Sequence, residues 1–296
     1  MSTQLRIGFA GLGLMGQGMA ANILGKGYSL TILGHRNRAP IEDLLARGAT
    51  EAKDARALAE ASDVVFLCLT GSPQVAEVVA AMKPGLKAGA VVVDCSTTEP
   101  QVTEALARDL AAQGVDYADA PLSRTPKEAW AGTLDCMVGA DPAVLARIQP
   151  VIATWAAKIV HIGGLGDGHR MKLLNNFLSL GYGALYAEAL AMAAKVGIPV
   201  EKFDSVIRGG RMDCGFYQTF MGYNLEGNRE AHRFTLQNAY KDTRYAESMA
   251  NAVGVATPLG SAIKNSYALA LGLGGDGPTD YVPHLADFVK RANGVG

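Results

Sequence analysis

Four polar residues spaced along one long apolar segment could carry out carbonyl chemistry. Lys172 is followed by Asn175, Asn176 and Ser179. In an α-helix these spacings place the four side chains on one stripe. An amine, two amides and a hydroxyl could hold a carbonyl substrate and pass it a proton. Burying such groups unpaired costs about 1–3 kcal/mol each. The alternative is structural: Lys172 extends to solvent and the asparagines bond to loops.

The segment that carries this stripe is predicted to be one long helix. It runs from about Asp167 to Val196 without an internal proline, and Gly197 and Pro199 end it. The helix is apolar on most sides, so it must be covered by neighbouring helices or by a second subunit. The rest of the chain also has helical patterns, which predicts an all-α second domain with helices near 200–208, 236–252, 258–271 and 281–291.

A glycine-rich loop near the start predicts a dinucleotide site. An apolar strand expected from Leu5 to Ala10 runs directly into a G-x-G-x-x-G pattern, and a helix follows. The glycines allow a tight turn and a close approach of a pyrophosphate to the helix N-terminus. Alone, the pattern could be a turn without a ligand. The strand–turn–helix setting favours a cofactor site made by Gly11, Leu12, Gly13, Leu14, Met15 and Gly16.

The end of the second predicted strand, 29–33, bears on which dinucleotide binds. NAD sites usually carry an acidic residue here, but this chain continues Gly34-His35-Arg36-Asn37-Arg38. Guanidinium groups suit a 2′-phosphate. We therefore favour NADP over NAD and expect His35, Arg36 and Asn37 at the cofactor. The alternative is that the arginines are ordinary loop charges and either cofactor is used.

Strands and helices then alternate as far as about residue 162, which predicts a parallel sheet with helices on both faces. Ligands of such sheets lie at the carboxyl ends of the strands. That rule places Leu69 and Thr70, and likewise Ser96 and Thr97, beside the cofactor. For Ser96 and Thr97, capping of the helix that follows is an equally good interpretation.

A later strand end delivers two hydroxyls and a guanidinium, from Ser123, Thr125 and Arg124. Pro126 stiffens this turn. An arginine in such a place is typical of a clamp for a substrate anion. The alternative is an ordinary surface arginine.

Length and composition are those of a globular protein with two domains. The 296 residues suggest a dinucleotide-binding domain at 1–164 and a helical domain at 165–296, with a change of composition after Ile162. The net charge of −1 argues against nucleic acid as a partner. Dispersed cysteines and histidines suggest no metal site. We expect a cytoplasmic protein without a membrane span, since the first residues lack a signal pattern.

Taken together, these motifs resemble the β-hydroxyacid dehydrogenase family over essentially the whole chain. The resemblance rests on Gly11–Gly16, Asp94–Thr97, Asp119–Ser123 with Gly132-Thr133-Leu134, Lys172–Asn176, and Phe234 with Lys241-Asp242. It implies a Rossmann domain followed by an all-α domain that binds substrate and dimerises. It also implies that Lys172 is catalytic, that Asn176 supports it, and that Lys241 contacts the cofactor.

One departure from the family pattern points to a branch. Where the family usually has Ser-Gly-Gly, this chain has Ser123-Arg124-Thr125, similar to the branch containing 3-sulfolactaldehyde reductase, once described as γ-hydroxybutyrate dehydrogenase. In that branch the arginine binds a sulfonate. The resemblance implies that Arg124, Thr125, Asn175 and Ser179 hold the substrate anion. Arg36 is similar to the arginine of the NADPH-dependent reductases.

The expected activity is NAD(P)-dependent interconversion of a small anionic aldehyde and its hydroxyacid, an oxidoreduction at a CH–OH group. A 3-hydroxyisobutyrate or tartronate semialdehyde type of dehydrogenase is the alternative. Imine reduction is more remote, because relatives with that activity replace the lysine. A non-catalytic scaffold is also remote, because Lys172 is intact. The apolar helix suggests a homodimer or homotetramer formed through the helical domain.

Overall fold

The computed structural model describes residues 5–295, which form two compact units. One unit extends to Lys172 and the other begins at Leu173. The division therefore falls inside the helix α8 (Asp167–Lys195), eight residues beyond the boundary expected at 164/165. Residues 1–4, on which the expected lack of a signal pattern rests, lie outside the described residues.

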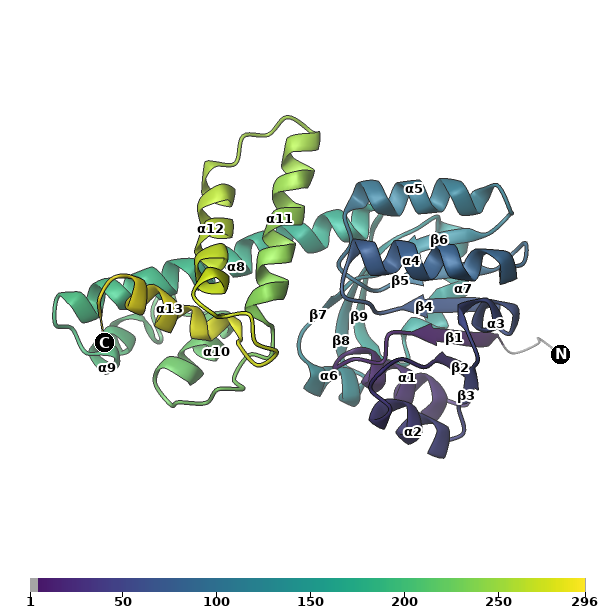
Figure 1. Cartoon of the computed structure of the whole chain (residues 1–296), viewed down its shortest axis with the longest axis horizontal. Coiled ribbons are helices and arrows are strands. Elements are labelled where there is room, and N and C mark those ends of the chain that lie inside the picture. The colour runs from purple at the N-terminus through teal and green to yellow at the C-terminus, as the bar shows by residue number, and fades with distance from the viewer. Residues whose placement is uncertain (1–4, 296) are drawn as a thin grey trace. The chain divides into compact units, whose positions relative to one another are not determined.

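The first unit is built on a nine-stranded sheet with the order β3-β2-β1-β4-β5-β6-β8-β7, in which β9 also pairs with β8 (Figure 1). The strands are β1 (Arg6–Ala10), β2 (Ser29–Leu33), β3 (Thr50–Ala52), β4 (Val64–Leu67), β5 (Val91–Asp94), β6 (Asp116–Asp119), β7 (Leu122–Ser123), β8 (Leu134–Gly139) and β9 (Ala156–Gly163).

The central strands are buried on both faces. Along β4 the side chains alternate between two cores: Val64 and Phe66 pack into one, and Val65 and Leu67 into the other. A run of apolar residues without polar alternation is typical of a parallel sheet covered on both sides. The covering helices are α1 (Gly16–Gly25), α2 (Ala39–Ala46), α3 (Ala55–Glu60), α4 (Ser72–Met82), α5 (Pro100–Ala111), α6 (Pro126–Ala131) and α7 (Pro142–Ile152), and a 3₁₀ turn, η1 (Lys83–Gly85), follows α4.

The predicted fold class is confirmed. The structure adds antiparallel pairing at one strand of the sheet and three short elements to the first unit. The strands β1 to β6 pair in parallel, but β8 is antiparallel to both β6 and β7. The short elements β3, β7 and α6 were not predicted. Two or three residues are too few to show a periodic pattern, and α6 is a helix of six residues.

The second unit is helical, as predicted. Its core joins α8 to the later helices through Leu180, Ala187, Tyr217 and Tyr267. The further elements are α9 (Val200–Ile207), α10 (Gly215–Asn224), α11 (Leu236–Ala252), α12 (Pro258–Gly272), η2 (Val282–His284) and α13 (Leu285–Ala292). Of these helices, α10 was not predicted.

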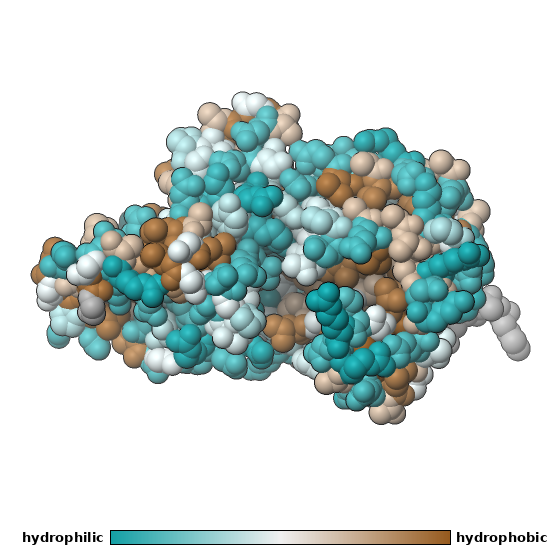
Figure 2. All heavy atoms as spheres, in the orientation of Figure 1, coloured by the Kyte–Doolittle hydropathy of each residue, from teal (hydrophilic) through white to brown (hydrophobic). Residues whose placement is uncertain are grey.

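The helix α8 is the one described helix whose length and composition would also suit a membrane span, although 44% of its most apolar window is buried. The core helix of a soluble protein meets the same criteria. Leu180, Ala184 and Leu190 of α8 pack into the helical core, so protein covers one of its faces. Its other face carries exposed apolar residues. In Figure 2 apolar residues reach the surface at the end of the helical unit where α8, α9 and α13 lie.

Candidate active site

The strand ends that should face a ligand are aligned at one edge of the sheet. In adjacent strands, Ala10 pairs with Leu67, Leu67 with Asp94, and Asp94 with Asp119. The order β3-β2-β1-β4-β5-β6 is that of a dinucleotide-binding fold, whose ligand crevice lies where the order reverses, between β1 and β4. The loops after these two strands carry the predicted residues Gly11–Gly16 and Leu69-Thr70.

The loop between β1 and α1 fits a pyrophosphate. Gly11 has a φ of +99°, and a Cβ there would lie 2.2 Å from the Cys68 carbonyl oxygen. A Cβ on Gly13 would meet nothing within 4 Å, so the backbone there is open to a ligand. The first turn of α1 carries no acidic residue to repel an anion. The geometry of this loop is therefore compatible with a close approach of a dinucleotide to its backbone.

The two arginines after β2 are in different situations. The Arg38 guanidinium makes two hydrogen bonds to the Glu51 carboxylate, of 2.6 and 2.9 Å. This bond holds the pKa of the Glu51 carboxyl below its usual range. No ion pair to Arg36 is formed within residues 5–295, and its side chain is exposed, as are those of His35 and Asn37. Arg36 is therefore the more available cation at this loop.

The loops after β4 and β5 are tied together. The Leu69 amide donates to the Ser96 hydroxyl (2.9 Å), and the Ser96 amide donates to the Asp94 carboxylate (2.9 Å). Thr70 and Thr97 follow at the same edge. The residue preceding α5 is Glu99, and its amide donates to Ser72. The alternative that Ser96 and Thr97 cap α5 is therefore wrong.

Arg124 occupies an unusual backbone position. Its φ is +87°, the one positive value of a non-glycine residue in the described chain. Such a conformation costs about 1–3 kcal/mol and tends to occur at functional sites. Ser123 pairs with Asp135 across β7 and β8, and the Arg124 Nε lies 3.0 Å from the Asp135 carboxylate. The Arg124 side chain is half exposed.

Thr125 begins α6 through a capping box. Its amide (3.1 Å) and its hydroxyl both donate to the Glu128 carboxylate, and Pro126 starts the helix. These hydrogen bonds hold the pKa of the Glu128 carboxyl below its usual range. The hydroxyl predicted to bind substrate therefore makes a local bond here. The pattern Thr125-x-x-Glu128 is the sequence signal that could have revealed α6.

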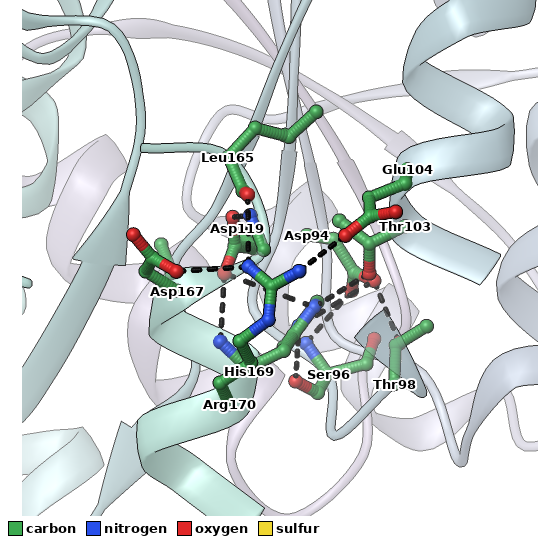
Figure 3. Close-up of polar contacts among 12 residues, drawn as sticks. Asp94, Ser96, Thr98, Thr103, Glu104, Asp119, Leu165, Asp167, His169 and Arg170 are labelled. Atoms are coloured by element: carbon green, nitrogen blue, oxygen red, sulfur yellow. Dashed lines mark hydrogen bonds and ion pairs between the residues drawn. The ribbon is translucent and has the colours of Figure 1, made fainter. Parts of the chain in front are cut away.

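A buried polar cluster, which the sequence did not reveal, lies under the first turn of α8 (Figure 3). The Asp119 carboxylate accepts the amides of Gly166 and His169, each at 2.7 Å. The His169 ring contacts Thr103 and the carbonyl of Ser96. Burial raises the pKa of the Asp119 carboxyl. This cluster anchors the helix that carries Lys172.

At the surface above this cluster, Arg170 bonds to Asp167 (2.8 Å) and to Glu104 of α5. The pair with Glu104 joins the first turn of α8 to α5.

Farther along α8, the predicted polar stripe is bonded within the helical unit. The Asn176 amide donates to Asp242 of α11 (2.6 Å), and Lys241 Nζ lies 3.2 Å from the same carboxylate. Asn175 donates to the Asn176 side-chain oxygen (3.3 Å), and the Ser179 hydroxyl donates to the Asn176 carbonyl (3.4 Å). Asn176 and Lys241, predicted separately, thus meet at one buried aspartate.

Three of the four cysteines, which lie in the first unit, are not prepared for nucleophilic chemistry. Burial raises the pKa of the Cys68 thiol to about 12 and raises those of Cys95 and Cys136 further. Across residues 5–295, no three His, Cys, Asp or Glu side chains are grouped as a metal ion would need.

The strand order and the glycine loop are those of a dinucleotide-binding fold, which is followed here by a helical unit. Comparison with known proteins agrees. Residues 6–163 match the NAD-binding domain of 6-phosphogluconate dehydrogenase, and residues 166–282 match the domain described as NAD-binding of NADP-dependent 3-hydroxyisobutyrate dehydrogenase.

Individual relatives point the same way. The chain is 30% identical to 3-sulfolactaldehyde reductase of Escherichia coli over 271 residues, covering 90% of this chain and 91% of that protein. It is 37% identical over 213 residues to 2-(hydroxymethyl)glutarate dehydrogenase of Eubacterium barkeri, covering 70% of this chain and 69% of that protein. The structure of 3-hydroxyisobutyrate dehydrogenase from Mycobacterium tuberculosis with L-serine superposes with a TM-score of 0.86 at 26% identity, over 97% of this chain and 100% of that chain.

The chain belongs to the β-hydroxyacid dehydrogenase family, and it is an NAD(P)-dependent oxidoreductase of CH–OH groups. The resemblance inferred from the motifs is therefore confirmed.

Proposed function

We propose that the protein interconverts a small anionic aldehyde and its hydroxyacid, with Lys172 as acid and base and Arg124 as the clamp for the anion. The semialdehyde and sulfolactaldehyde types of substrate are the favoured ones. This choice draws on the 3-sulfolactaldehyde reductase of Escherichia coli and on the Ser123-Arg124-Thr125 loop.

The observation that carries this proposal is the backbone of Arg124. A left-handed conformation favours glycine, so an arginine there is a poor choice for stability alone. Its guanidinium is half exposed, and a carboxylate oxygen of Asp135 already lies 3.0 Å from its Nε. A carboxylate therefore bonds to this group in the structure, and the planar donor array suits a substrate carboxylate or sulfonate equally well.

The expected chemistry assigns one role to each polar group. The reduced nicotinamide, when bound, supplies the hydride to the carbonyl carbon. Lys172 donates a proton to the carbonyl oxygen as negative charge develops there, and takes the hydroxyl proton in the reverse direction. Arg124 holds the acid group so that the carbonyl is oriented for reaction. Asn176, fixed by Asp242, supports Lys172 on the same helix.

NADP is the proposed cofactor. Support comes from the absence of a carboxylate directly after β2 and from the exposed Arg36, which forms no ion pair within the described chain. A guanidinium there suits a 2′-phosphate. Residues 166–282 also match a domain described as that of an NADP-dependent enzyme.

A substrate panel tests the proposal. The purified protein, with NADPH and separately with NADH, is assayed against sulfolactaldehyde, succinic semialdehyde, tartronate semialdehyde and methylmalonate semialdehyde. We expect kcat/KM to be at least about tenfold higher for one of these anions than for an uncharged aldehyde of the same length. Equal values for charged and uncharged aldehydes would contradict the clamp.

Replacement of the lysine tests the mechanism. We expect Lys172→Ala to bind NADPH with unchanged affinity and to lose about 10³-fold in kcat. A variant that reduces every aldehyde at the wild-type rate would remove Lys172 from the mechanism.

We also propose a homodimer or homotetramer formed through the helical unit. Support comes from exposed apolar side chains on the solvent face of α8, among them Leu178, Leu185 and Met192. Light scattering coupled to size-exclusion chromatography measures the assembly, and Leu185→Lys is expected to weaken it.

A cytoplasmic location is proposed because the four cysteines are free thiols, as in reducing compartments, and cell fractionation tests it.

A further inference from the structure

Among the histidines of the first unit, His169 is the one that is fully buried. The reaction proposed above makes no use of it. Its exposed fraction is 0%, as are those of its neighbours Asp94 and Asp119. Nδ1 lies 2.8 Å from the Thr103 hydroxyl, and Nε2 lies 3.1 Å from the Ser96 carbonyl oxygen. A buried imidazole ring needs a hydrogen-bond partner for each nitrogen, and both nitrogens of His169 have one.

The hydrogen-bond chemistry of the neighbours orients the ring. A carbonyl oxygen can only accept, so Nε2 donates to Ser96, and Nδ1 bonds to the Thr103 hydroxyl. The Thr103 hydroxyl also lies 3.4 Å from the Glu99 carbonyl oxygen. Carboxylate oxygens of Asp94 and Asp119 lie 3.7 and 3.9 Å from the two nitrogens.

The ring joins segments that are far apart in sequence. It comes from the first turn of α8, while Ser96 follows β5 and Thr103 belongs to α5. The same turn is held from beneath by Asp119, which accepts the amides of Gly166 and His169. Lys172 is three residues beyond His169 on the same helix, so any rotation or shift of the turn moves Lys172 as well.

The packing leaves little room for such a shift. A Cβ on Gly168 would lie 2.6 Å from the Met137 carbonyl oxygen and 2.8 Å from the Asp119 carboxylate. The backbone of α8 thus touches β8 directly at this point. His169 supplies a second attachment, toward Ser96 after β5 and Thr103 of α5.

We propose that His169 is a positioning residue: its buried ring fixes the rotation of the first turn of α8 relative to the Ser96 loop and so places the Lys172 amine for proton transfer. The inference rests on the proposed role of Lys172. Reactions of this kind lose about 100-fold in rate when a group is misplaced by about 1 Å, so a positioning role predicts a large effect on kcat.

The test compares three variants. In His169→Leu we expect kcat to fall by about 10- to 100-fold. In His169→Gln we expect kcat to stay within about threefold of wild type, because the amide can donate to Ser96 and accept from Thr103. The control is His161→Leu, since His161 also bonds to one backbone carbonyl (Ala140, 2.9 Å) but is exposed in β9. Its kcat should not change.

Cofactor affinity separates positioning from a general structural role. Ser96 keeps its bonds to Leu69 and Asp94 when the ring is lost. The Kd for NADPH, measured by fluorescence titration, should therefore change by less than about threefold in His169→Leu. Thermal unfolding shows what fraction of each variant is folded, and rates are expressed per folded enzyme. A kcat per folded molecule equal to wild type in His169→Leu would overturn the inference.

A double-mutant cycle separates the positioning role of His169 from the catalytic role of Lys172. If His169 acts through Lys172, His169→Leu should lower the residual kcat of Lys172→Ala by less than about threefold. A loss as large as in the wild-type background would overturn the inference and leave the role of Lys172 intact. Wild-type kcat in Lys172→Ala alone would instead overturn the proposed mechanism.

A second variant serves if His169→Leu fails to fold. Thr103→Val removes one bond to the ring and is expected to lower kcat by about threefold to tenfold. An unchanged kcat in Thr103→Val would contradict the inference.

Discussion

The buried cluster under α8 and the two arginine loops use polar groups in opposite ways. His169, Asp94 and Asp119 are fully buried, and each makes at least two hydrogen bonds. Arg38 and Arg124 pair with acids while their side chains remain 48% and 51% exposed. Buried groups that lose a partner are costly, whereas exposed ion pairs contribute about 0–1 kcal/mol. The cluster therefore fixes geometry, and the loops are suited to choose ligands.

Breaking the cluster should have the largest effect. In Asp119→Ala the amides of Gly166 and His169 lose their buried acceptor. We expect the free energy of unfolding to fall by about 3 kcal/mol, measured by urea denaturation. The matched control is Asp116→Ala in the same strand, where the side chain is exposed, with a change within about 0.5 kcal/mol. Equal losses in the two variants would show that the cluster has no special role.

Changing the arginine loop should affect activity without weakening the fold. In Arg124→Gly we expect kcat/KM for an anionic aldehyde to fall by about 100-fold, because the charge-assisted bonds are lost. The free energy of unfolding should rise by up to about 1 kcal/mol, because glycine adopts the positive φ without strain.

Two controls sharpen this prediction. Arg124→Lys keeps the charge and loses the planar donors, so kcat/KM should fall about tenfold with little change in stability. An uncharged aldehyde should react with Arg124→Gly and with the wild type at similar rates. If that aldehyde lost as much as the anion, Arg124 would not be acting as an anion clamp.

The loop after β2 should show a smaller effect, on the choice of cofactor. We expect Arg36→Ala to reduce the preference for NADPH over NADH by about tenfold. Glu51→Gln weakens the bond to Arg38 and leaves that arginine more available to a phosphate, so the preference should rise by about threefold. The ratio of kcat/KM for the two cofactors measures both. Arg56→Ala, which removes another surface ion pair, should leave it unchanged.

The smallest effect is expected at the capping box. The bonds from Thr125 hold the pKa of the Glu128 carboxyl below its ordinary value of 4.5. Ionised Glu128 therefore stabilises the fold above about pH 4.5, and this contribution disappears as the pH falls through the lowered pKa. The free energy of unfolding of the wild type should exceed that of Glu128→Gln by about 0.5 kcal/mol at pH 7, and the difference should shrink as the pH falls below 4.5. A difference that grows as the pH falls would contradict this assignment.

Much of the framework could be predicted from local patterns. The helix expected from Asp167 to Val196 is observed as Asp167–Lys195, because a long apolar segment without proline has few alternatives. The glycine loop lies between β1 and α1, as its spacing requires. Among the elements that were missed, β3 and β7 have only three and two residues, too few for a periodic pattern, whereas α6 carried a capping-box signal that was overlooked.

The candidate residues were easier to choose than their partners. Arg36 and Arg38 look alike in the sequence, but Glu51 pairs with only one of them. Ser96 could have been a helix cap, and instead its hydroxyl accepts the Leu69 amide. Thr125 was expected at the substrate, and its hydroxyl bonds to Glu128. In each case the deciding group lies elsewhere in the chain or in an element that was not predicted.

The sequence by itself determined the alternation of the main strands and helices, the dinucleotide loop and the helix that carries Lys172. These depend on glycine positions and on apolar periodicity, which act over a few neighbouring residues. Only the tertiary structure decided that His169 meets Ser96, 73 residues away, and that its amide meets Asp119, 50 residues away. Such pairs form because adjacent strands end at one edge of the sheet, and no local pattern specifies which polar side chains are buried together there.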